Sequence, residues 1–296
     1  MYRIGVDIGG TKVKMGLFDG KGQRLLESCR ESVKNISSLP TYVVEAVEAL
    51  AEDGGVSLSQ ISFCGVGIPG TVSEDGKRIL KAPNISILSE DLAEELEHAL
   101  GIPVRLIQDS RAAAWGEYLA CEEKPRSLVC ITLGTGIGTG LVIGGAIYHG
   151  ALGSAGEMGH LPLREDGRPC GCGKRGCVEK YCAGGGLDRT AEELLGAGKD
   201  ARDLFLAARE GNSSAAEALD EAVRGLGGAI VAIVNLLSPD RILFSGGLSR
   251  QTEQYLNPVI AYVRAHCYSA GALPVMEVAS LGEDSPLFGA AFMPIP

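Results

Sequence analysis

Four potential metal ligands lie close together in the middle of the sequence. His160 is followed by Cys170, Cys172 and Cys177, and glycines stand between the cysteines. Short cysteine spacings allow one loop to wrap around an ion, and four protein ligands complete the tetrahedral coordination of a structural Zn²⁺ site. Free thiols that happen to be neighbours are the alternative. We favour a structural zinc ion, because a catalytic site would keep one position open.

Glycine turns follow three apolar stretches of the chain, and such turns let backbone N–H groups approach an anion without interference from a Cβ atom. The three turns are Gly9-Gly10-Thr11-Lys12, Gly134-Thr135-Gly136 and Gly246-Gly247. A single glycine turn is a common strand connection, but its recurrence in the same context favours phosphate binding. The high glycine content, 42 residues, likewise suggests that the backbone approaches a ligand at several places.

Two other nucleotide-binding motifs are excluded. The chain has no Gly-x-x-x-x-Gly-Lys-Ser/Thr sequence, so it is not a P-loop protein. The segment Gly65 to Gly70 matches Gly-x-Gly-x-x-Gly after a predicted strand. However, Thr71-Val72 and a charged hairpin follow it, whereas a dinucleotide site requires a helix there.

Asp109 is the best candidate for a general base. It lies between a predicted strand at Val104 to Ile107 and a predicted helix that ends at Ala120, the edge where α/β proteins bind ligands. Capping of the helix by its carboxylate is the alternative role. Glu157 and Glu179 flank the cysteine loop and could accept hydrogen bonds from a polyol. His98 and His149 are expected at the surface.

Composition restricts the class of protein. The 296 residues carry a net charge of −10 and no cluster of Lys and Arg, so nucleic acid is not an expected partner. An acidic protein can still bind ATP, because backbone amides and magnesium contact the phosphates locally. The sequence has no apolar run long enough to span a membrane and no secretory signal. We therefore expect a cytoplasmic protein without a membrane partner.

The predicted elements alternate between strands and helices, which is typical of an α/β protein with mixed sheets. A strand at 3–8, a glycine turn and a second strand at 13–18 open the chain. The pattern recurs with a strand at 128–133, a turn at 134–138 and a strand at 141–143. Two such units about 125 residues apart indicate an internal duplication.

Several of these motifs together resemble the ROK family of sugar kinases and repressors, and the resemblance spans essentially the whole chain. The motifs are Asp7 to Lys12, Leu133 to Gly140, Gly156 to His160, Cys170 to Cys177 with Glu179, and Ser245 to Gly247. The resemblance implies the actin-like ATPase (ribonuclease H-like) fold, with two α/β domains and a cleft between them. We expect a small domain at 1–115, completed by a last helix at about 284–296, and a larger one at 116–283 that carries the zinc loop. A homodimer is also implied.

The resemblance also implies roles for individual residues. Asp109 would take the proton from the 6-hydroxyl of a sugar as this oxygen attacks the γ-phosphate of ATP, and Asp7 would hold Mg²⁺ through water. The first two glycine turns would bind phosphates, and Gly246 and Gly247 would contact adenosine. The implied ATP and Mg²⁺ residues are Asp7, Gly9, Gly10, Thr11, Lys12, Gly134, Thr135, Gly136, Gly246 and Gly247. The implied sugar-binding residues are Gly70, Asn84, Gln108, Asp109, Glu157, His160 and Glu179. His160 would bind zinc through one ring nitrogen and face the sugar with the other.

One departure from the family pattern affects the expected substrate. The family usually has Asn-Asp followed two residues later by Asn, whereas this chain has Gln108-Asp109-Ser110-Arg111. Glucose or an epimer such as allose is the expected substrate, and N-acetylmannosamine or N-acetylglucosamine is the alternative. A catalytically weak sugar-binding regulator is the non-enzyme alternative. A repressor is not expected, because we find neither a basic helix nor a DNA-binding domain ahead of the first strand.

Overall fold

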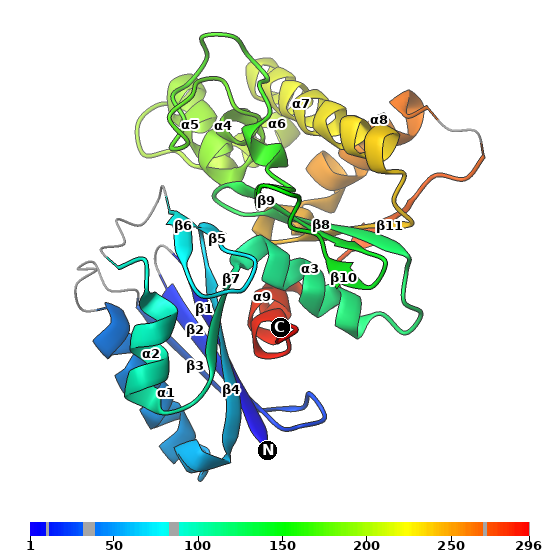
Figure 1. The fold of residues 1–296 in the computed structure, drawn as a ribbon. Helices are drawn as coiled ribbons and strands as arrows, with labels where there is room; N and C mark the ends of the chain where they lie inside the picture. Colours follow the sequence, from blue (N-terminus) through cyan, green and yellow to red (C-terminus); the bar gives the residue numbers. More distant parts are fainter. Residues whose placement is uncertain (10–11, 32–38, 83–88, 269–270, 296) are drawn as a thin grey trace.

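The computed structural model describes residues 1–9, 12–31, 39–82, 89–268 and 271–295, and it contains two five-stranded sheets, one in each half of the molecule (Figure 1). The first sheet consists, in spatial order, of β3 (Arg24–Glu31), β2 (Lys12–Phe18), β1 (Tyr2–Ile8), β4 (Ile61–Ile68) and β7 (Val104–Gln108). The second consists of β10 (Ala146–Ile147), β9 (Ile137–Ile143), β8 (Ser127–Leu133), β11 (Arg241–Ser245) and β12 (Val275–Val278).

The two sheets have the same topology. In each, three consecutive strands pair antiparallel, and two later strands are added in parallel beside the first of them. This identity of strand order and direction confirms the predicted duplication and the α/β class. Strands β4 and β8 are buried over most of their length and β1 over its central part, because helices cover both faces of each sheet.

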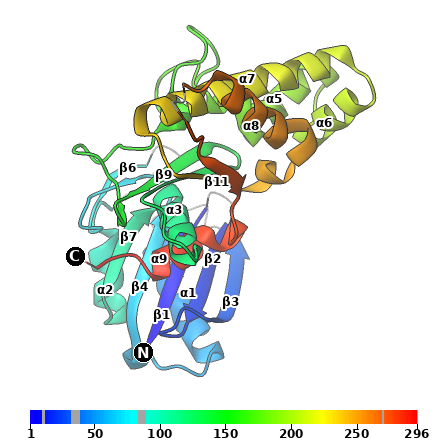
Figure 2. The same cartoon turned by 90° about the vertical axis from the view of Figure 1, so that its right-hand side faces the viewer.

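Helices α1 (Leu39–Asp53) and α2 (Leu92–Leu100) cover one face of the first sheet, and α9 (Ser285–Ala291) covers the other. Helix α3 (Asp109–Ala120) packs on the second sheet and against α9, so these two helices lie between the halves (Figures 1 and 2). The remaining helices cover the outer side of the second sheet; they are α4 (Glu179–Cys182), α5 (Gly184–Leu195), α6 (Ala201–Arg209), α7 (Ser213–Leu237) and α8 (Asn257–His266). The short elements are the hairpin β5 (Thr71–Val72) and β6 (Ile79–Lys81), the 3₁₀ turns Leu58–Gln60, Met158–His160, Gly247–Arg250 and Gly282–Asp284, and the π-helix Thr252–Leu256. Among the described residues, no helix combines the length and apolarity required to cross a bilayer.

Some of the glycines permit backbone-to-backbone packing around α9. A Cβ atom at Gly65 would lie 1.8 Å from the carbonyl oxygen of Ala290, and one at Gly289 would lie 1.8 Å from that of Ala112. A side chain at either position would separate α9 from β4 or from α3. The glycine-rich segment of β4 therefore serves helix packing, which explains why it matches a dinucleotide motif without forming one.

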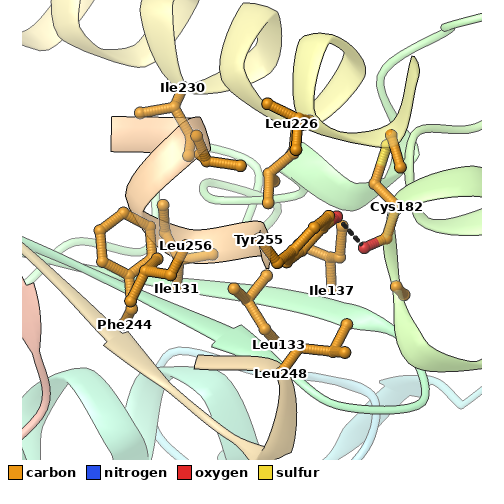
Figure 3. Packing of buried hydrophobic residues seen from close by; sticks show 14 of the residues in the cluster. Ile131, Leu133, Ile137, Cys182, Leu226, Ile230, Phe244, Leu248, Tyr255 and Leu256 are labelled. Carbon is orange, nitrogen blue, oxygen red and sulfur yellow. Dashed lines mark hydrogen bonds between the residues drawn. The ribbon is translucent and has the colours of Figure 1, made fainter. Parts of the chain in front are cut away.

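The core of the second half connects its helices to its sheet (Figure 3). Ile131 and Leu133 of β8, Phe244 of β11 and Leu226 of α7 are buried and belong to one hydrophobic cluster. The fully buried Tyr255, in the π-helix, donates its hydroxyl proton to the carbonyl oxygen of Cys182 at 2.5 Å. This hydrogen bond satisfies the polar end of a buried aromatic side chain and connects the segment after β11 to α4.

Two predicted boundaries are wrong. Strand β9 begins at Ile137 rather than after a turn at 134–138, because Gly138 and Gly140 let the strand pack closely on α3: a Cβ atom at Gly140 would lie 2.3 Å from the carbonyl oxygen of Ser110. The apolar pattern predicts a helix only around Ala191 to Leu195, but α5 begins at Gly184, because its first turn consists of three glycines that provide no pattern. The apolar runs Ile61 to Ile68 and Val275 to Val278 predict strands, and β4 and β12 have these bounds.

We propose that residues 1–115 and 284–296 form one domain and residues 116–283 the other. In support, α9 packs against β1 and β4, and its buried residues Leu287 and Ala291 share a cluster with Phe18 of β2. The last helix therefore contributes apolar contacts to the sheet at the beginning of the chain.

Candidate active site

Asp109 is the first residue of α3, directly after β7, and it lies at the junction of the two halves. The backbone N–H of Ser110 donates to its Oδ1 atom at 2.6 Å. Burial raises the pKa of Asp109 to about 7, the nearby charges of Asp7 and Glu157 add to this, and the hydrogen bond from Ser110 opposes it. Gln108 occupies the N-cap position, and no side chain caps the helix there. The Asp109 carboxylate itself, however, accepts one of the free backbone N–H groups of the first helical turn.

Asp7 is the second carboxyl group at this junction. It lies near the end of β1, and burial raises its pKa to about 6, partly opposed by the charge of Lys14. Asp7 also raises the pKa of Asp109, which places two mutually repelling carboxyl groups near each other. A divalent cation would relieve this repulsion, and carboxylate oxygen is a ligand type that Mg²⁺ accepts. The donor chemistry at Asp7 thus fits Mg²⁺.

Four further residues predicted to bind sugar converge from both halves. The side-chain amide of Gln108, at the end of β7, donates to Glu157 Oε1 at 3.1 Å. The ring of His160 lies between two carboxylates, with Nε2 3.8 Å from Glu157 Oε2 and Nδ1 3.9 Å from Glu179 Oε1. The negative charge of Glu157 also raises the pKa of Asp109. The structure thus brings Gln108, Asp109, Glu157, His160 and Glu179 together.

The four predicted metal ligands form one cluster. The ligand atoms of His160, Cys170, Cys172 and Cys177 all lie within 4.8 Å of one another. The sulfur atoms of Cys172 and Cys177 are 3.6 Å apart, and the sulfur of Cys170 is 3.6 Å from His160 Nδ1. Sulfur atoms bound tetrahedrally at about 2.3 Å from zinc are separated by about 3.8 Å, so the donor set and its spacing fit Zn²⁺. Nδ1 is the His160 nitrogen on the side of the cysteines.

The loop that carries the cysteines is held by backbone contacts. Isolated bridges pair Pro162 with Cys177 and Pro169 with Arg175. Gly176 has a φ of +74°, and a Cβ atom there would lie 1.6 Å from the carbonyl oxygen of Arg164. Only glycine is therefore compatible with this crossing, which places Cys177 beside the other ligands.

Two of the three glycine turns lie side by side. A Cβ atom at Gly246 would lie 2.5 Å from the carbonyl oxygen of Leu133, so this turn contacts the end of β8 next to Gly134. Gly134 and Gly247 face open space, where a ligand can approach their backbone. The backbone N–H groups of Gly184 and Gly185 donate to Gly134 and Thr135, which fixes the second turn on the start of α5.

The other predicted binding residues are placed as follows. A Cβ atom at Gly136 would lie 3.0 Å from Glu179 Oε2, so the second glycine turn adjoins the sugar-binding candidates. The backbone N–H of Gly9 donates to the carbonyl oxygen of Lys12 at 2.8 Å. Gly70 is buried beside Lys81, at the base of the β5–β6 hairpin. Gly10, Thr11 and Asn84 lie outside the described residues.

Sequence reasoning missed one interaction beside the site. His149 is half-buried rather than at the surface, and its Nδ1 atom lies 3.1 Å from the buried guanidinium group of Arg111. His98, as predicted, is exposed. The sequence did contain a signal for this interaction. Arg111 is the third residue of a helix that is otherwise mostly apolar, and a buried guanidinium group requires hydrogen-bond partners.

A cavity of about 510 Å³ lies elsewhere, behind the cysteine loop and between α5 and α7. Its arginines are already paired: Arg164 with Glu221 at 2.5 Å and Arg168 with Glu193 at 2.6 Å. None of the predicted site residues lines it. We therefore place the candidate active site at the junction around Asp109.

Comparison with known proteins defines the class of this protein. The ROK family pattern matches residues 3–295. The chain is 34% identical to a glucokinase from Streptomyces coelicolor, over 97% of this chain and 96% of that protein. It is 32% identical to an N-acetylmannosamine kinase from Salmonella newport, over 99% and 98% of the two chains.

Solved structures agree with the sequence comparison. A ROK family glucokinase from Streptomyces griseus, in complex with glucose and AMPPNP, superposes with a TM-score of 0.84 at 32% identity, over 98% of each chain. The protein therefore belongs to the ROK family, and the predicted actin-like ATPase fold is confirmed.

Proposed function

We propose that this protein is an ATP-dependent sugar kinase that phosphorylates the 6-hydroxyl of an aldohexose, with Asp109 as the general base. The support comes from its similarity to two kinds of sugar kinase and to a ROK glucokinase solved with glucose and an ATP analogue. The observation that carries the proposal is the convergence of Asp109 with Gln108, Glu157, His160 and Glu179. A general base is most effective when its pKa is near the working pH, and the pKa of Asp109 is about 7.

Each group has a defined task in this proposal. Glu157, Glu179 and the free ring nitrogen of His160 bind sugar hydroxyls and orient the 6-hydroxyl toward Asp109, which accepts its proton. The glycine turns at Gly134 and Gly246 bind the nucleotide through backbone N–H groups, while Asp7 holds Mg²⁺, which neutralises phosphate charge. His160, Cys170, Cys172 and Cys177 hold a structural Zn²⁺, and its bond to His160 fixes the ring that contacts the sugar.

The identity of the sugar separates two related proposals. Glucose or an epimer such as allose is the first candidate, and the similarity to N-acetylmannosamine kinases supports an N-acetylhexosamine as the second. We would measure ATP consumption by the purified protein with glucose, allose, mannose, fructose, N-acetylglucosamine and N-acetylmannosamine. Turnover of one sugar well above the others is the expected result. No turnover by folded, zinc-loaded protein would contradict the kinase proposal and favour a sugar-binding regulator.

We also propose that the protein acts as a homodimer in the cytoplasm. The support for both statements is the resemblance to the ROK family rather than any contact in this chain. Multi-angle light scattering at several protein concentrations would test the dimer, and a monomer at micromolar concentration would contradict it.

The rate is expected to depend on pH through Asp109. The carboxyl group must be ionised to accept a proton, and its pKa is raised to about 7, so kcat/KM for the sugar should decrease as the pH falls through this value. Below about pH 6 the decrease should approach tenfold per pH unit. Initial rates at limiting sugar and saturating ATP, between about pH 5.5 and 9, would measure it. A flat profile across this range would contradict the assignment.

A further inference from the structure

Arg111 is a buried cation whose hydrogen bonds all go to one segment. The residue is 1% exposed, although a guanidinium group stays protonated in proteins. It contacts His149 Nδ1 at 3.1 Å and donates to the carbonyl oxygens of Gly153 at 2.6 Å and Ala155 at 3.3 Å. In the described part of the chain its Nε atom has no hydrogen-bond partner, although the negative charge of Glu157 acts favourably on the guanidinium group. A desolvated charge is costly unless such contacts compensate for it.

The segment that Arg111 contacts has no regular structure. Residues 149–155 lie between β10 and the 3₁₀ turn that begins at Met158. Within the segment, the N–H of Gly153 donates to Gly150 and that of Ala155 to His149, so these two bonds fold it on itself without attaching it to a neighbouring element. The side chain of Leu152, at its centre, is 89% exposed. The three contacts of Arg111 are therefore a principal attachment of this segment to α3.

The attachment connects two parts of the candidate site. Arg111 is two residues after Asp109 on α3, and Ala155 is two residues before Glu157. The Glu157 carboxylate accepts a hydrogen bond at 3.1 Å from the side-chain amide of Gln108, the residue directly before α3. Gly156, between Ala155 and Glu157, packs on β9, where a Cβ atom would lie 2.4 Å from the carbonyl oxygen of Thr139. The Arg111 contacts and this contact with β9 together set the position from which Glu157 reaches Gln108.

We propose that Arg111 is a positioning residue that, through residues 149–155, holds Glu157 in the geometry that binds the sugar. The role in sugar binding rests on the proposed function. His149 takes part as an acceptor: because Arg111 can only donate, Nδ1 must carry the lone pair and Nε2 the proton. Burial, followed by the charge of Arg111, lowers the pKa of His149, which favours this neutral form.

Two pairs of variants test the role. Arg111→Met removes all three contacts but keeps a side chain of similar length. Arg111→Lys keeps the positive charge but lacks the planar guanidinium group with its forked N–H donors. His149→Phe keeps a ring and removes the acceptor, whereas His149→Asn can place an amide oxygen near the position of Nδ1. Arg264→Met, at an exposed position on α8, is the matched control. We would measure hydrogen exchange of peptides covering 148–157 in the unliganded protein, and kcat and KM separately for the best sugar.

Arg111→Met is expected to increase exchange in this segment at least about tenfold and to raise the sugar KM about 10- to 100-fold, with kcat changed less than about threefold. Arg111→Lys should lie between Arg111→Met and wild type. His149→Phe should act in the same direction, and His149→Asn should recover most of the loss. Unchanged KM and exchange in folded Arg111→Met would overturn the proposal.

The remaining outcomes are also decisive. If Arg111→Met does not fold, the two His149 variants decide, and equal KM values for them would refute the role. If the wild-type protein turns over no sugar, the proposed function fails. Hydrogen exchange then still tests the attachment of 149–155, and unchanged exchange in both the Arg111 and His149 variants would overturn it.

Discussion

Replacing Asp109 by Asn is expected to reduce kcat by about 10²- to 10⁴-fold while the sugar still binds. The amide has the shape of the carboxyl group but cannot accept the proton of the attacking hydroxyl. The Gln108–Glu157 contact does not involve the Asp109 side chain, so the sugar Kd should change by less than about tenfold. A coupled ATPase assay would measure kcat, and isothermal titration calorimetry would measure Kd. Turnover close to that of the wild type would exclude Asp109 as the base.

The same substitution is expected to stabilise the fold at alkaline pH. The folded-state pKa of Asp109 is raised from 3.8 to about 7, so its ionised form destabilises the native state. The contribution of Asp109 to the free energy of unfolding is most favourable below its unfolded-state pKa of 3.8, and it declines until the pH has passed about 7. By pH 8 the cost is up to about 4 kcal/mol, and less where solvent screens the group. Asp109→Asn removes this cost.

The stability effect has a clear experimental signature. The melting temperature of Asp109→Asn relative to wild type should rise from pH 5 to pH 8. Asp53→Asn, at an exposed position at the end of α1, is the control. A variant that is less stable than wild type at pH 8 would mean that the carboxylate makes stabilising contacts. A gain in stability together with a loss of activity is typical of a residue whose environment is adapted to catalysis.

Replacing Cys172 by Ser is expected to abolish binding of the proposed zinc ion and to destabilise the larger half of the molecule. The cluster contains four ligands with tetrahedral spacing, and a serine hydroxyl is a poor substitute for a thiolate. Zinc content should decrease from about one ion per chain to less than about 0.1. The free energy of unfolding should decrease by several kcal/mol, since metal affinity contributes to folding. Plasma emission spectrometry and calorimetry would measure the two quantities.

A matched control separates this effect from general loss of a thiol. Cys29 is exposed on the edge strand β3, far in sequence from the cluster, and Cys29→Ser should keep zinc and stability. Loss of zinc should also raise the sugar KM, because His160 has Nδ1 beside Cys170 and Nε2 toward Glu157. A Cys172→Ser protein with full zinc content and unchanged melting would refute the site.

The sequence by itself determined those features that depend on neighbouring residues. Strand β4 ends as predicted because Pro69-Gly70 cannot continue it, and β7 and α3 meet at Asp109 because an apolar run gives way there to a helical pattern. The repeated strand–turn–strand unit predicted the duplication that both sheets display. Three of the four metal ligands lie within eight residues, so their spacing alone predicted the cluster.

The tertiary structure decided the contacts between distant parts of the chain. Gln108 meets Glu157 across 49 residues, and Arg111 meets His149 across 38. Gly65 touches the backbone of α9, which lies at the other end of the sequence. Such contacts depend on how the two sheets and the helices between them pack, and this packing results from many apolar contacts at once. Local sequence encodes which side chains are available, whereas the packing of the two halves determines which of them meet.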